Sequence, residues 1–161
     1  MPCWRLVDSS LWIAFHRIGR LSLLLRLPSI AIARVVLREL QRGRDELPQR
    51  IGRALRGRCF DLDLEADDLA ATLADILTAR DRRLSEPDAI QVAWAQLHAQ
   101  TTVLYMRDTP AQPQARRTGA PVRGHQELLR DMVALGLLTP DEAVEVGGEL
   151  ERYFRPRGGR P

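Results

Sequence analysis

Five acidic side chains stand at positions where a fold could bring them together. Asp8 follows the apolar run WRLV, Glu39 lies in VVLREL, Glu86 and Asp88 stand in LSEPDAIQVAWA, and Asp108 ends VLYMRD. Carboxylates that converge on one cleft repel one another, so one of them must hold a proton unless a cation enters. Mg²⁺ prefers carboxylate oxygens and retains several waters. A cluster of this kind suits metal-dependent hydrolysis of a phosphodiester.

Each acid also has an ordinary structural interpretation. Asp8 and Asp88 can begin helices, where backbone N–H groups and the helix dipole favour a negative charge. Glu39 can be an exposed helix residue, and Asp108 can shape a turn. The metal-site hypothesis therefore depends on the acids taken together and not on any one of them.

Strand and helix patterns alternate along the chain. The expected strands are Cys3–Val7, Ser29–Ile32, Cys59–Leu64, Thr101–Met106 and a short strand at Val122. The expected helices are Leu11–Ile18 with Ser9 or Ser10 as N-cap, Leu21–Leu27, Ala33–Gln41, Pro48–Leu55, Asp67–Thr78, Ser85–His98, His125–Leu135 and a last helix from Thr139. This alternation predicts an α/β fold with a parallel sheet, in which ligands bind beyond the carboxyl ends of the strands.

Length and composition predict one folded domain. The chain has 161 residues, 45% of them hydrophobic, and a net charge of +3, which excludes global disorder and argues only weakly for a nucleic-acid partner. Arginines interrupt the apolar stretch near the N-terminus, so we expect neither a signal peptide nor a membrane span and predict a soluble, cytoplasmic protein. In Asp67–Thr78 the residues Leu69, Leu73, Ile76 and Leu77 form the expected packing stripe.

Arginines crowd the segment 42–58. Arg44, Arg50 and Arg53 could bind an RNA backbone, because guanidinium groups contact phosphates through two N–H groups. A solvated helix face is an equally good interpretation of the same residues.

The ordered motifs resemble those of the PIN-domain nucleases, especially the toxin-type, VapC-like branch, from about Arg5 to Leu138. VDSSLWIAFHRIGRLSLLLRL is similar to the opening of that family and ARVVLREL to its second motif. LSEPDAIQVAWA is similar to the third motif, and VLYMRD with the small residues and glycines after it to the fourth. Together, in this order, the motifs are fairly specific.

The resemblance implies a three-layer α/β/α sandwich with a mostly parallel sheet over residues 1–154, followed by a mobile tail at 155–161. It implies a Mg²⁺- or Mn²⁺-dependent endoribonuclease, plausibly the toxin of a toxin–antitoxin pair, with RNA as substrate, an antitoxin as possible partner and a homodimer as assembly. Asp8 would bind the metal with Ser10 in support, Glu39 would be the second acid, and Asp108 would complete the cluster. Either Glu86 or Asp88 would be the third acid.

Four residues depart from the family pattern. Met106 stands where a threonine is usual, Thr109 where an arginine is frequent, and Pro110 and Pro113 where relatives begin a helix, which must therefore start late. These departures motivate the alternative of a weakened or inactive PIN-like module that binds RNA or a protein partner. A third alternative is an interaction protein that dimerises through exposed apolar helices.

Overall fold

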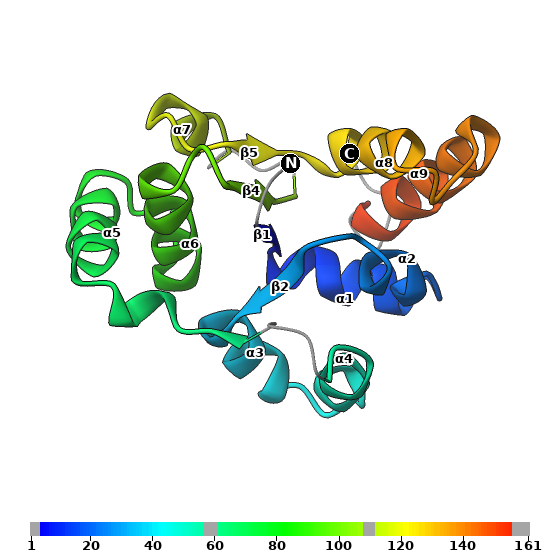
Figure 1. Ribbon diagram of the computed structural model, residues 1–161, viewed down its shortest axis with the longest axis horizontal. Helices are drawn as coiled ribbons and strands as arrows, with labels where there is room; N and C mark the ends of the chain where they lie inside the picture. Colours follow the sequence, from blue (N-terminus) through cyan, green and yellow to red (C-terminus); the bar gives the residue numbers. More distant parts are fainter. Residues whose placement is uncertain (1–3, 57–60, 108–111, 156–161) are drawn as a thin grey trace.

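The computed structural model describes residues 4–56, 61–107 and 112–155 (Figure 1). The strands are β1 (Trp4–Val7), β2 (Ile30–Ala33), β3 (Asp61–Leu62), β4 (Thr102–Tyr105) and β5 (Val122–Arg123). The helices are α1 (Ser9–Arg17), α2 (Leu21–Leu25), α3 (Arg34–Gln41), α4 (Leu47–Ala54), a 3₁₀ turn η1 (Leu64–Ala66), α5 (Asp68–Arg80), α6 (Glu86–Leu97), α7 (Gln112–Arg117), α8 (His125–Ala134) and α9 (Pro140–Phe154). Asp108, Thr109 and Pro110 lie outside the described residues, as does the predicted tail beyond Arg155.

The five strands form one parallel sheet in the order β3-β2-β1-β4-β5. The order reverses at β1, since the chain adds β2 and β3 on one side and β4 and β5 on the other. The last residues of β1 and β4, Val7 and Tyr105, are register partners. The residue after Val7 is therefore at the switch point of the sheet, the place where α/β proteins bind ligands.

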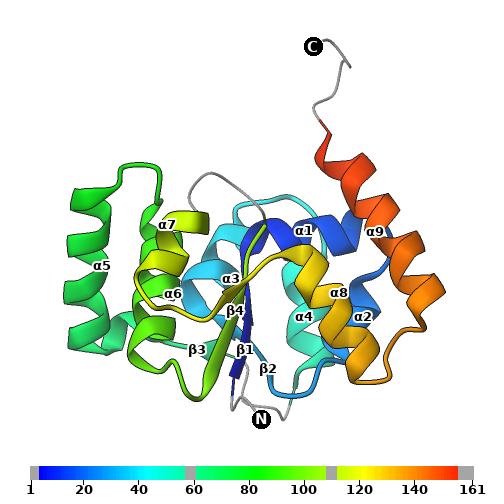
Figure 2. The same ribbon diagram turned by 90° about the horizontal axis from the view of Figure 1, so that it is seen from above.

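Helices cover both faces of the sheet. Figure 2 shows the sheet nearly edge-on, with α5, α6 and α7 on one side and α1, α2, α4, α8 and α9 on the other. The interior strand β2 is buried along its whole length, as expected of a parallel strand covered on both faces. The predicted α/β/α sandwich with a parallel sheet is confirmed. In the described part of the chain, no helix is long and apolar enough to cross a membrane.

Helix α5 differs from its sequence prediction in the face that it buries. Its buried residues are Ala70, Ala74 and Leu77, whereas Leu69 is 72% exposed and Ile76 is 41% exposed. Small alanines allow α5 to approach α6 closely, and α5 and α6 pack together extensively. The predicted stripe of four large apolar residues is therefore wrong apart from Leu77 and the partly buried Leu73.

Helix α7 begins at Gln112 and has Pro113 in its first turn. Proline fits this position because the N–H groups of a first turn have no partner within the helix. Residues 108–111, which precede it, lie outside the described residues, so the late start of this helix stays a prediction.

Candidate active site

Asp8 lies at the switch point, directly after β1, and is only 6% exposed. It occupies the N-cap position of α1, but its carboxylate accepts no hydrogen bond from the backbone of that helix. The Ser10 hydroxyl donates to Asp8 Oδ2 (2.9 Å), and Gln91 Nε2 donates to Asp8 Oδ1 (3.3 Å). The prediction of Ser9 or Ser10 as N-cap is wrong, and capping of α1 does not explain the Asp8 side chain.

Asp88 projects from the first turn of α6 toward Asp8. The helix itself is capped by Ser85, whose Oγ accepts from the backbone N–H of Asp88 (3.3 Å). Burial, the negative charge of Asp8 and a hydrogen bond with Asp8 raise the pKa of Asp88 to about 7, and a hydrogen bond with Ser85 partly opposes the rise. The two carboxyl groups thus form one unit, in which a proton on Asp88 relieves the repulsion.

Glu39 supplies a third carboxylate from α3. Burial is the largest cause of its raised pKa, the charge of Asp8 adds to it, and a hydrogen bond with Ser9 and the charge of Arg42 oppose it. Its Oε2 atom is buried and has no hydrogen-bond partner among the residues that the structure describes. Glu39 also raises the pKa of Asp88. The structure therefore brings Asp8, Glu39 and Asp88 within electrostatic reach of one another.

The remaining predicted acids are placed differently. Glu86 is exposed and lies beside Pro87 at the start of α6, where it lines a groove. Asp108 lies outside the described residues, two residues after the buried Met106. Of the two candidates for the third acid, Asp88 is the one that contacts Asp8.

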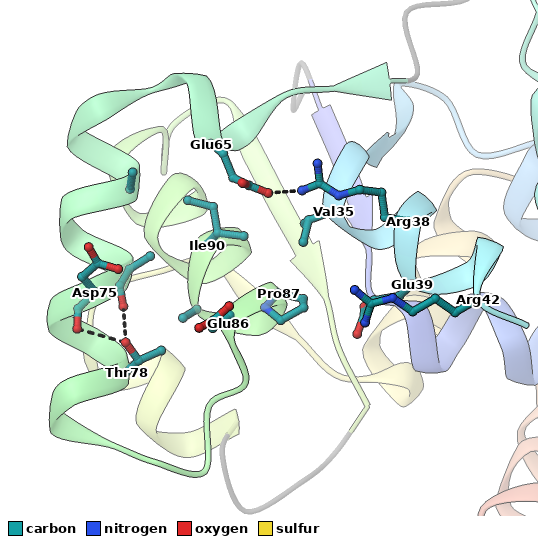
Figure 3. Close-up of a pocket in the computed structure, with 13 residues that line it drawn as sticks. Val35, Arg38, Glu39, Arg42, Glu65, Asp75, Thr78, Glu86, Pro87 and Ile90 are labelled. Carbon is teal, nitrogen blue, oxygen red and sulfur yellow. Dashed lines mark hydrogen bonds and ion pairs between the residues drawn. The ribbon is translucent and has the colours of Figure 1, made fainter.

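The groove runs from Glu39 to the space between α3, α5 and α6 and has a volume of about 520 Å³ (Figure 3). Helix α3 contributes Arg38 and Arg42 to its wall, and α5 contributes Asp75 and Thr78. Arg38 forms an ion pair with Glu65. Glu39 is the member of the acidic cluster that lines the groove, where it lies with the guanidinium groups of Arg38 and Arg42, side chains of a type that binds phosphates.

The predicted RNA-binding arginines Arg44, Arg50 and Arg53 are all exposed. Arg50 contacts His16 Nδ1 (3.3 Å), and Arg53 lines a separate hollow on α4 with Arg56. The arginines that line the groove with Glu39 are Arg38, its neighbour on α3, and Arg42, three residues after it at the C-cap of that helix.

Sequence reasoning missed Gln91. It is completely buried on α6, three residues after Asp88, and it contacts Asp8. Two features of the sequence could have indicated Gln91. It lies three residues after Asp88, so the two share a face of the helix, and it interrupts an otherwise apolar run.

The residues suit a hard divalent cation in type. Three carboxylates are present, one with an unpartnered buried oxygen, and no ion pair of the described residues involves any of them. In the described ranges, however, no group of three or more His, Cys, Asp or Glu side chains is arranged to hold a metal ion. The residue types suit a divalent cation. In the structure itself, a proton on Asp88 reduces the repulsion between the carboxylates.

Comparison with protein-family models identifies the family of this chain. A protein-family model described as a PIN domain matches residues 5–152, nearly the whole chain. No curated protein matches the chain. PIN domains are generally nucleases and typically use divalent metal ions. The match and the α/β/α fold with acids at its switch point agree, and the chain belongs to the PIN-domain family.

Proposed function

We propose that this protein is a Mg²⁺- or Mn²⁺-dependent endoribonuclease. One observation carries the proposal. Asp8, Glu39 and Asp88 converge from three elements on one edge of the sheet, and no basic side chain of the described residues forms an ion pair with any of them. Maintaining like charges together costs free energy, so such a cluster favours a functional explanation over a structural one.

The acidic residues would have distinct roles in the proposed reaction. Asp8 and Asp88 would hold the metal, with Ser10 supporting Asp8, and Asp108 would complete the ligand set. When bound, the ion would neutralise charge on the phosphate and lower the pKa of a coordinated water. Glu39, with its raised pKa and unpartnered Oε2, would hold a proton close to the reacting groups.

RNA is the proposed substrate. The groove of Figure 3 begins at Glu39 and carries Arg38 and Arg42, whose guanidinium groups would bind phosphates on either side of the cut bond. Glu86 lines the same groove, where its charge would limit how closely a phosphate approaches.

The test is cleavage of a labelled RNA with Mn²⁺, Mg²⁺ or EDTA. We expect metal-dependent cleavage that falls at least about 100-fold in Asp88→Asn, because a charged metal ligand is lost. Glu86→Gln, on the same helix turn, is the matched control and should retain most activity. Full activity in Asp88→Asn would refute the site, and loss only in Glu86→Gln would transfer the third-acid role to Glu86.

The finer biological role that we propose is that of a toxin. Expression of the wild-type chain in a bacterial host should arrest growth, whereas Asp88→Asn at equal abundance should not. Normal growth of cells that contain soluble, active protein would contradict the toxin role and leave the nuclease activity as proposed.

A second candidate is a PIN-like module that binds RNA without cutting it. The absence of a preformed metal group among the described residues favours this candidate. It predicts RNA binding that EDTA does not weaken and no cleavage with any divalent ion, so the same assay separates the two.

The proposed homodimer has a suitable surface on α5. Leu69 and Ile76 are exposed on α5, with the partly buried Leu73 between them, and α5 is the outermost element of its layer in both views (Figures 1 and 2). Antiparallel pairing of two α5 helices would bring Asp68 of one copy toward Arg80 of the other. Light scattering should show a dimer that Leu69→Glu converts to a monomer, whereas Val144→Glu, at an exposed position on α9, leaves it intact.

A further inference from the structure

Gln91 makes two directed contacts from a fully buried position. Its Nε2 donates to Asp8 Oδ1 (3.3 Å) and to the backbone oxygen of Pro87 (3.2 Å). Both partners are acceptors only, so the side-chain amide must present its nitrogen to them, and a flipped amide would bring oxygens together. The orientation of this side chain is therefore determined by its surroundings.

A glutamine at this position needs an explanation. Its neighbours Ala89, Ile90, Val92 and Ala93 are all buried, and an apolar side chain would continue that run. Gln91 Oε1 accepts no hydrogen bond from any described residue, although a buried polar atom without a partner costs free energy. Packing alone would favour methionine or leucine here.

The contact with Asp8 supplies the explanation. Ser10 and Gln91 donate to different oxygens of the same carboxylate and so fix the plane in which it lies. A carboxylate has about four lone-pair directions, so these two donors and the hydrogen bond with Asp88 leave one direction for a further ligand. Such donors behind a metal-binding side chain hold it ready for the ion.

We propose that Gln91 is a positioning residue that holds Asp8 in the orientation needed for divalent-metal binding. The inference rests on the proposed function and adds a role for a neutral side chain that touches neither metal nor substrate. Its simplest competitor is a structural role, in which Gln91 only ties the first turn of α6 through the oxygen of Pro87.

The test compares Gln91→Met with Gln96→Met. Gln96 lies on the same helix and also has a buried Oε1 without a partner, but it lines a hollow with Leu73 and Arg117 and has no hydrogen bond to Asp8. Methionine matches glutamine in length and removes the donor. Mn²⁺ affinity is measured by calorimetry, and unfolding is measured in EDTA for each variant.

We expect Gln91→Met to lower Mn²⁺ affinity by about tenfold or more, and Gln96→Met to leave it unchanged. In cleavage assays, Gln91→Met should need correspondingly more Mn²⁺ for half-maximal rate. A purely structural role would change the unfolding midpoint in EDTA and leave the Mn²⁺ affinity of the folded protein as it was.

The outcomes separate the two hypotheses. Wild-type affinity in Gln91→Met would overturn the positioning role while leaving the nuclease intact. An equal loss of affinity in both variants would also overturn it, because the effect would then be a general one of α6. Wild-type protein that binds no Mn²⁺ would remove the proposed function, and the positioning role with it.

Discussion

Two buried polar clusters meet β1 within three residues of each other, and their charges are organised in opposite ways. At Asp8, three carboxylates lie together, and none of them forms an ion pair with another described residue. The pKa values of Asp88 and Glu39 are raised. At Arg5, the guanidinium donates to the Tyr105 hydroxyl (2.6 Å), which donates to Asp131 Oδ2 (2.7 Å), while Arg123 donates to Asp131 Oδ1 (2.8 Å). The second cluster combines both signs of charge, whereas the first is acidic only.

The contrast indicates that the Arg5 cluster is a structural network and that the Asp8 cluster is a functional site. The Arg5 cluster connects β1, β4, β5 and α8 and leaves its carboxylate paired, as a stabilising network should. In the Asp8 cluster, repulsion between the carboxylates lowers the stability of the folded state. Natural proteins tolerate such a cost mainly where function requires it. Substitutions should therefore affect activity at one cluster and stability at the other.

The largest effect is expected for Asp8→Asn. RNA cleavage should fall at least about 100-fold because the metal loses a charged ligand, while the free energy of unfolding in EDTA stays the same or rises by about 1 kcal/mol as repulsion is removed. Chemical denaturation and the cleavage assay measure the two quantities. A strongly destabilised Asp8→Asn would mean that this cluster, too, is structural.

The pH dependence of stability should come from the acidic cluster. The pKa of Asp88 is about 7 in the folded protein and about 4 when unfolded, so the folded state binds more protons between these values. The contribution of Asp88 to stability without metal should be fully present below about pH 4 and should be lost, by roughly 2–4 kcal/mol, as the pH rises through 7. Glu39 contributes in the same direction.

Urea denaturation in EDTA at several pH values tests this slope, with Asp88→Asn as the comparison. The variant should lose most of the decline. A wild-type protein that becomes steadily more stable from pH 4 to 7 would contradict the shared-proton arrangement.

Tyr105→Phe tests the balanced cluster. Removing the hydroxyl leaves Arg5 and Asp131 short of a partner, so we expect a loss of about 1–3 kcal/mol in unfolding free energy with Mn²⁺ affinity unchanged. Tyr153→Phe is the matched control, because Tyr153 is exposed on α9. Equal stability of both variants would show that the Arg5 network contributes little.

The smallest effect is expected in the groove. Arg42→Ala should weaken RNA binding a few-fold and reduce the salt dependence by about one counterion. Arg53→Ala, on the separate hollow of α4, provides the comparison, measured by fluorescence anisotropy at two salt concentrations. A larger effect of Arg53→Ala would place RNA along α4.

The sequence predicted the alternating elements because β1, β2 and β4 are short apolar runs between helical patterns. It also predicted that Asp8 stands at a strand end, since the polar residue follows the run directly. It could not predict the contact between Asp8 and Asp88, which are 80 positions apart and meet only through the packing of α6 on the sheet.

Two failures have physical causes that sequence patterns conceal. On α5, large apolar residues suggested the buried side, but alanines make the close contact with α6 and leave Leu69 outside. On α6, Gln91 is one polar residue within an apolar run, and its partner Asp8 lies 83 positions earlier in the sequence. Arg5 was equally unpredictable, because its partners come from β4 and α8.

The four-residue length of β1 has an evolutionary consequence. A relative without the proposed nuclease activity would not need Asp8, and apolar substitutions there and at position 88 would raise its stability. Arg5, at the other end of the strand, would stay under selection for folding. Inactive members of this lineage should therefore retain the arginine–tyrosine–aspartate triplet and lose the acids.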